Sequence, residues 1–250
     1  MSHRRRVVFV RPDYWFLLDD LGGTGTHSLE FLFHFAPGIE LQMKEHHCLS
    51  SKGSSHFLIM SDLRMNLESC RGHEPSLQGW YSEDYGHRVP TPVLIGKVLS
   101  AVPARFPWLL WPNPPADANL CAVTGSRAAW IITSGERKDY LFFSDSSATE
   151  SPEVSTNAEL AFLRAGGTCG IVRLTMVGGS TVYWQHEALL TTETTIEEFD
   201  LKQQDGLLDI QMKPIVRFAL RTPCITSVRL NGSTVAFERN SSGIIVSGGN

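Results

Sequence analysis

The segment Gly79–Pro90 concentrates the residue types that acid–base chemistry on an acidic substrate requires. Within this polar and aromatic segment, Tyr85, His87 and Arg88 lie within four residues. Histidine is a common general acid or base, tyrosine can serve when its pKa is lowered, and the arginine fork can pair with a carboxylate. We therefore take Tyr85, His87 and Arg88 as candidate catalytic residues. The competing interpretation is a rigid loop whose aromatic residues cover the edge of a sheet.

Asp19 and His34 form a second candidate site, for a metal ion. Zinc accepts a carboxylate and an imidazole but needs at least one more protein ligand, for which His27, His46 and His47 are near in sequence. An aspartate at the end of one strand and a histidine on the next can come within ligand distance if the two strands form a hairpin. The competing interpretation is structural, with Asp19 starting a turn and His34 being an ordinary strand histidine.

The elements that must position these residues are predicted to be β-strands. Residues 5–11 and 14–19 are rich in strand-forming residues and flank Pro12-Asp13, which predicts a hairpin. Residues 27–36 alternate between two faces, one of which is apolar throughout. The apolar face carries Leu29, Phe31, Phe33 and Phe35, and the other carries Ser28, Glu30, Leu32 and His34.

Short strand-like segments separated by turn residues continue to the end of the chain. Gly178-Gly179 and Asn231-Gly232 are typical tight-turn pairs, and only residues 157–165 and 195–199 hint at helix. This pattern predicts an all-β fold, a large antiparallel β-sandwich. We expect it to occupy residues 1–200, with residues 201–250 either closing the sandwich or forming a small second sheet.

Composition narrows the class of protein further. The chain is 42% hydrophobic and 19% charged with a net charge of −4, which is typical of a packed protein and gives no nucleic-acid signal. No apolar stretch approaches the roughly twenty residues of a membrane span. The five cysteines form no CxxC pair, and P-loop, HExxH and GxSxG motifs are absent. A mildly acidic protein can still bind an anionic polymer if its basic residues line one cleft.

Four blocks of the sequence resemble, in this order, stretches of the heparinase II/III-like polysaccharide lyases. They are residues 3–21 (HRRRVVFVRPDYWFLLDDL), 25–37 (GTHSLEFLFHFAP), 79–94 (beginning GWYSEDYG and ending PTPVL) and 228–235 (beginning VRLNG). The resemblance implies a large β-sandwich that follows a helical toroid in the family. It also implies cleavage of acidic, uronate-containing polysaccharides by β-elimination, in which a base removes the proton next to the uronate carboxylate.

The resemblance also carries expectations about sites, partners and location. Asp19 and His34 look like family ligands of a structural zinc, whose third ligand we expect upstream. The long helices of the toroid and the family's His-Asn pair are absent from this sequence, so we expect the C-terminal β-sandwich portion of a lyase, inactive alone. It would act with the missing toroid or a partner chain on an acidic polysaccharide. The family implies the bacterial periplasm or secretion, with the cytoplasm as the alternative because no signal peptide is visible.

Two alternative functions stay open at this point. One is a non-catalytic carbohydrate-binding or interaction module, in which the pairs Trp108/Trp111 and Trp80/Tyr81 stack on sugar rings. The other is a small metal-dependent β-barrel enzyme that uses Asp19 and His34.

Overall fold

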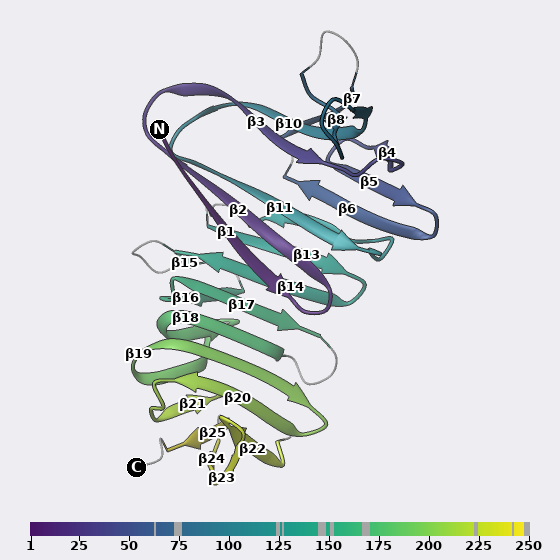
Figure 1. The fold of residues 1–250 in the computed structure, drawn as a ribbon. Helices are drawn as coiled ribbons and strands as arrows, with labels where there is room; N and C mark the ends of the chain where they lie inside the picture. Colours follow the sequence, from purple (N-terminus) through teal and green to yellow (C-terminus); the bar gives the residue numbers. More distant parts are fainter. Residues whose placement is uncertain are drawn as a thin grey trace. The chain divides into compact units, whose positions relative to one another are not determined.

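The regular secondary structure of the described residues consists of β-strands joined by turns and loops. The computed structural model describes residues 1–62, 64–72, 77–123, 126, 128–144, 149–150, 153–166, 171–222, 225–241 and 243–247, and these contain no helix (Figure 1). No membrane-spanning helix is therefore found within these ranges. The chain divides into two compact units, Met1–Ala116 and Asp117–Asn250. The predicted all-β, antiparallel fold is confirmed.

The first unit contains two principal sheets and a small hairpin. One sheet has six strands in the order β1-β2-β11-β6-β5-β4, another has three in the order β3-β10-β7, and β8 pairs with β9. The strands are β1 (Ser2–Val10), β2 (Tyr14–Gly22), β3 (Thr26–His34), β4 (Glu40–Met43), β5 (His47–Lys52), β6 (Ser55–Ser61), β7 (Asn66–Arg71), β8 (Trp80–Tyr81), β9 (Val89–Pro90), β10 (Pro92–Ala101) and β11 (Ala104–Pro112).

The six-stranded and three-stranded sheets share one hydrophobic core, so the first unit is a β-sandwich. Phe31 of β3 lies against Trp108 of β11, with ring centroids 5.4 Å apart, and the Phe33 ring lies 4.7 Å from the same indole. A side chain at Gly96 of β10 would place its Cβ 2.5 Å from the Trp108 ring, so glycine makes this close approach possible. The alternation predicted for residues 27–36 is confirmed, with Leu29 and Phe31 buried.

In the residues that the structure describes, the second unit is one continuous sheet of fourteen strands. The strands are β12 (Asn119–Ala122), β13 (Ala129–Ser134), β14 (Arg137–Phe143), β15 (Thr149–Glu150), β16 (Val154–Thr156), β17 (Leu160–Ala165), β18 (Ile171–Trp184), β19 (Glu187–Gln204), β20 (Leu207–Lys213), β21 (Phe218–Leu220), β22 (Ser227–Leu230), β23 (Ser233–Val235), β24 (Glu238–Asn240) and β25 (Gly243–Val246).

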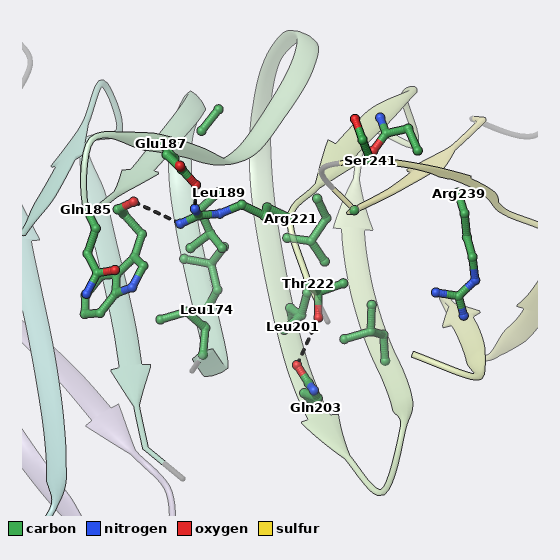
Figure 2. A pocket seen from close by; sticks show the side chains of 17 residues that line it. Leu174, Gln185, Glu187, Leu189, Leu201, Gln203, Arg221, Thr222, Arg239 and Ser241 are labelled. Carbon is green, nitrogen blue, oxygen red and sulfur yellow. Dashed lines mark hydrogen bonds and ion pairs between the residues drawn. The ribbon is translucent and has the colours of Figure 1, made fainter. Parts of the chain in front are cut away.

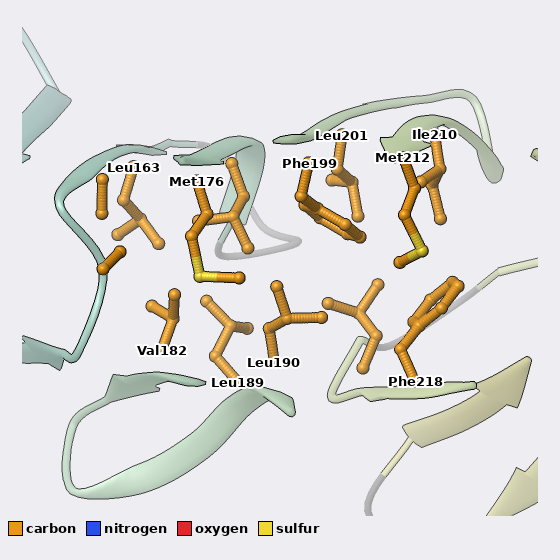
Figure 3. Close-up of a cluster of buried hydrophobic side chains, with 14 of the residues drawn as sticks. Leu163, Met176, Val182, Leu189, Leu190, Phe199, Leu201, Ile210, Met212 and Phe218 are labelled. Carbon is orange, nitrogen blue, oxygen red and sulfur yellow. The ribbon is translucent and has the colours of Figure 1, made fainter. Parts of the chain in front are cut away.

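The long hairpin β18–β19 carries this sheet from one layer into a second. The first half of β18 pairs with β17, the second half with β16, and β19 pairs with β20 at one end and β21 at the other. The register slips near Gly179, and Gly178 has φ +63°, so the expected turn at Gly178-Gly179 is instead an irregularity inside β18. Apolar side chains of the two layers meet across the core (Figure 3).

Three further predictions from the sequence concern two helices, a turn and a domain boundary, and each can be compared with the strands above. The helix hinted at for residues 157–165 and 195–199 is wrong, because these segments contribute to the strands β17 and β19. The strand β17 is paired along both edges and buried on both faces, so its sequence lacks the polar–apolar alternation of a half-exposed strand. The turn at Asn231-Gly232 is confirmed, with φ +48° and +85° between β22 and β23. Residue 200, the expected domain boundary, lies within β19.

The cysteines of the described part of the chain differ in exposure: Cys48 is buried, Cys70 is half-buried and Cys121 is exposed. Cys48, Cys70 and Cys121 are free thiols, while Cys169 and Cys224 lie outside the described residues. Cys48 is buried, and burial raises the pKa of its thiol to about 11. This thiol therefore stays protonated and unreactive at neutral pH.

Candidate functional site

The candidate catalytic segment folds as a small hairpin, β8–β9, closed by a polar turn. Trp80 pairs with Pro90, and Tyr81 pairs with Val89. Inside the turn, the Ser82 hydroxyl lies 2.7 Å from the carbonyl oxygens of both Asp84 and His87 and can donate to either. The hydroxyl thereby holds the two sides of the turn together.

Backbone hydrogen bonds attach the base of this hairpin to the sandwich. The Gly79 carbonyl accepts from the backbone N–H groups of Gly72 and Thr91, each at 2.8 Å, and the Thr91 hydroxyl donates to the Phe35 carbonyl at 2.5 Å. A Cβ at Gly72 would lie 2.4 Å from the Gly79 oxygen and 2.6 Å from the Trp80 ring, and Gly79 itself has φ +84°. The two glycines therefore allow the hairpin to sit directly on the ends of the neighbouring strands.

The three candidate catalytic residues all lie on the turn of this hairpin. Tyr85 is fully exposed, and His87 is exposed beside it. The Arg88 guanidinium lies 4.1 Å from the centroid of the Trp80 ring, which is a cation–π contact. The arrangement presents a phenol, an imidazole and a guanidinium to solvent on one rigid projection, where they can contact a polymer or a covering surface.

Asp19, the first candidate metal ligand, is a buried carboxylate held by two basic side chains. It lies on β2 with no exposed surface, directly opposite Arg5 of β1. Arg5 donates to it through Nε at 2.7 Å and Nη2 at 2.9 Å, and His3 Nε2 lies 2.7 Å from its Oδ1. The hydrogen bond to Asp19 raises the pKa of Arg5. Asp19 therefore sits in a compact ion-pair cluster rather than at the start of a turn.

His34, the second candidate ligand, lies on a different sheet. It is exposed on β3 opposite Val93, and β3 pairs with β10, not with β2, so the hairpin that would bring it to Asp19 does not form. Within the described ranges, no three His, Cys, Asp or Glu side chains lie close enough together to hold a metal ion. The Arg5 cation also occupies both oxygens of Asp19. These residues do not fit a zinc site, and the structural zinc stays a prediction.

His3 and Arg5 are the partners of Asp19 that sequence reasoning missed, although the signal was present. The hairpin about Pro12-Asp13 was predicted, and its register places Val10 opposite Tyr14 and therefore Arg5 opposite Asp19. His3 follows on the same face two residues away. Counting outward from the predicted turn would have found both residues.

One of the two aromatic pairs proposed to stack on sugars is part of the core. Trp108 has no exposed surface and Trp111 only 3%, so neither can meet a ligand at the surface. Trp80 is half-buried beneath Arg88, and Tyr81 is exposed at the end of β8. The hairpin thus keeps aromatic rings available at the surface, as β1 does with Phe9, which is 41% exposed.

These features define the first unit as a β-sandwich domain with an anchored, solvent-facing polar hairpin. Residues 1–109 match the family described as heparinase II/III-like, C-terminal. This part of the chain is therefore a polysaccharide-lyase-related domain, and the resemblance inferred from the sequence is confirmed over these residues. The match ends close to Ala116, where the first unit ends, and the block at 228–235 lies outside it. Comparison with curated proteins gave no match.

Proposed function

We propose that this chain supplies the β-sandwich wall of a lyase that cleaves acidic, uronate-containing polysaccharides by β-elimination, and that it is inactive alone. The observation that carries the proposal is the coincidence of the family match at 1–109 with the compact unit Met1–Ala116. Because the matched residues form a compact unit, we propose for this unit the role that the corresponding domain has in the family. Its proposed partners are the acidic polysaccharide and a helical toroid, which would belong to a longer protein or to a partner chain. Its proposed location is the bacterial periplasm or outside the cell.

The chemistry of β-elimination explains why the chain is expected to need a second wall. A base must remove the proton next to the uronate carboxylate while another group neutralises the charge that develops there. Such stabilisation is strongest where water is excluded. Tyr85 and His87 are open to water on the hairpin turn, so the candidate groups gain this environment only when another surface covers them.

Lyase activity is the direct test of this proposal. The purified chain is incubated separately with heparin, heparan sulfate, alginate and hyaluronan, and the ultraviolet absorbance of the unsaturated uronate product is followed. We expect no rise above the polysaccharide blank. Sustained turnover on any of the four by the chain alone would contradict the inactivity that we propose.

A carbohydrate-binding role for the hairpin is the second candidate function, favoured by the exposure of Tyr85 beside the Arg88–Trp80 pair. The double variant Tyr85→Ala/Arg88→Gln removes one ring and one cation from an exposed turn, so it should fold normally. We expect native gels that contain an acidic polysaccharide to retard this variant several-fold less than they retard the wild type. The variant loses both the ion pair between Arg88 and a sugar carboxylate and the stacking of Tyr85 on a sugar ring, and together these losses explain a several-fold decrease in retardation.

The matched control for this gel experiment is Tyr183→Ala/Arg217→Gln, which removes an exposed tyrosine and an exposed arginine from the second unit. Its charge change is identical to that of the hairpin variant, so its retardation should stay near the wild-type value. Equal loss in both double variants would show a general charge effect and would remove the hairpin from the proposal.

A further inference from the structure

The second unit, which lies outside the family match, contains a cavity of about 880 Å³ between its two layers. This volume is within the usual range for a ligand pocket. The lining comes mainly from the turn between β18 and β19, from the far end of β19, and from residues 220–222 and 239–241. Figure 2 shows labelled side chains from each of these segments around the cavity.

The cavity has an apolar floor and a polar mouth. Leu174, Leu189, Leu201 and Leu220 form the floor, and each is at most 4% exposed, so these side chains are already covered by their neighbours. The side chains at the mouth are three amides, two hydroxyls and an indole. These residues are Gln185, Gln203, Thr222, Ser241, Asn240 and Trp184.

Charge in the lining has the opposite sign to the charge of the unit around it. Residues 117–250 contain 11 Lys and Arg against 15 Asp and Glu, yet the lining holds Arg221 and Arg239 against Glu187 alone. The Arg221 Nη2 donates to the Trp184 carbonyl at 3.0 Å, and its Nη1 is ion-paired with Glu187. Because the Glu187 side chain is 68% exposed, a ligand carboxylate can take its place at the guanidinium.

We propose that this cavity binds an acidic sugar, one or two residues of a uronate-bearing oligosaccharide. Amides and hydroxyls match the hydroxyl groups of a sugar, the Trp184 indole offers a ring edge or face, and Arg221 receives the carboxylate. The site uses residues of the second unit only, so it does not depend on the lyase role proposed for the first.

Isothermal titration of the full chain with a hyaluronan tetrasaccharide tests this site. Ala188→Trp places a bulky ring at an exposed position of the lining and should abolish binding at the cavity. Arg221→Gln removes the cation and should weaken binding about tenfold or more, as expected for loss of a charge-assisted hydrogen bond. The matched control is Arg217→Gln, which breaks the exposed ion pair with Glu193 away from the cavity and should leave the affinity unchanged.

The same titrations are repeated in the Tyr85→Ala/Arg88→Gln background, so failure of the cavity and failure of the hairpin are seen separately. Thermal unfolding midpoints accompany each variant, and if Arg221→Gln lowers its midpoint, Ala188→Trp decides the result. Absence of tetrasaccharide binding, or binding that Ala188→Trp leaves intact, would overturn the proposal. Equal or tighter binding of neutral chitotetraose, or of decanoate, would overturn the assignment to an acidic sugar.

Discussion

Replacement of Arg5 by methionine will lower the free energy of unfolding of the first unit by about 3 kcal/mol. Arg5 pairs with Asp19, whose carboxylate has no exposed surface and receives two of its hydrogen bonds from Arg5. Methionine preserves much of the side-chain volume but leaves a buried charge with His3 alone. Breaking one side of a buried pair costs more than the pair itself contributes, because the remaining charge is stranded.

The double variant Arg5→Met/Asp19→Asn separates the stranded charge from other effects. Removing both charges should restore more than half of the lost stability, and a double-mutant cycle from urea unfolding gives the coupling energy. Arg4→Met is the control on the same strand. Arg4 Nε lies 3.5 Å from Asp20, which also pairs with Arg6 and Arg105, so its loss should cost under about 1 kcal/mol.

Equal destabilisation by Arg5→Met and Arg4→Met would contradict this interpretation. That result would mean that β1, an edge strand, opens readily enough for water to solvate Asp19. The cluster would then contribute little to the attachment of β1. The comparison therefore measures how firmly the first strand of the sandwich is held.

Trp108→Ala will be the second severe change, with an expected loss of about 4 kcal/mol in the stability of the first unit. Trp108 is fully buried and contacts Phe31 and Phe33 across the sandwich, so alanine leaves a large cavity. Trp108→Phe keeps an aromatic ring at this position. Among the described residues, its indole Nε1 has no hydrogen-bond partner, so phenylalanine removes an unsatisfied buried group and should cost no more than about 2 kcal/mol.

The same pair of variants decides whether Trp108 contacts sugars. Urea unfolding followed by tryptophan fluorescence and circular dichroism measures stability, and native gels with acidic polysaccharide measure binding of the folded protein. Trp108→Phe should retain wild-type retardation, since the side chain is out of reach of any ligand at the surface. Retardation reduced to the level of Tyr85→Ala/Arg88→Gln would contradict the core assignment.

Much of the first unit follows from local sequence pattern. Pro12-Asp13 between two strand-forming segments specified the hairpin β1–β2, and period-two alternation specified which face of β3 is buried. These features depend on neighbouring residues, so they can be read without knowing the fold. Three of the four blocks that resemble the lyase family lie in the same region, within the family match at residues 1–109, and the fourth, 228–235, lies outside it.

The sequence by itself therefore determined the all-β class, the first hairpin and the family of residues 1–109. Only the tertiary structure decided that β2 pairs with β11 and β3 with β10, which places His34 on a different sheet from Asp19. It also decided that Trp108 is core and that Gly178 lies within a bent strand. The physical reason is that strand partners far apart in the chain are selected by packing of whole faces, a non-local term that no short segment encodes.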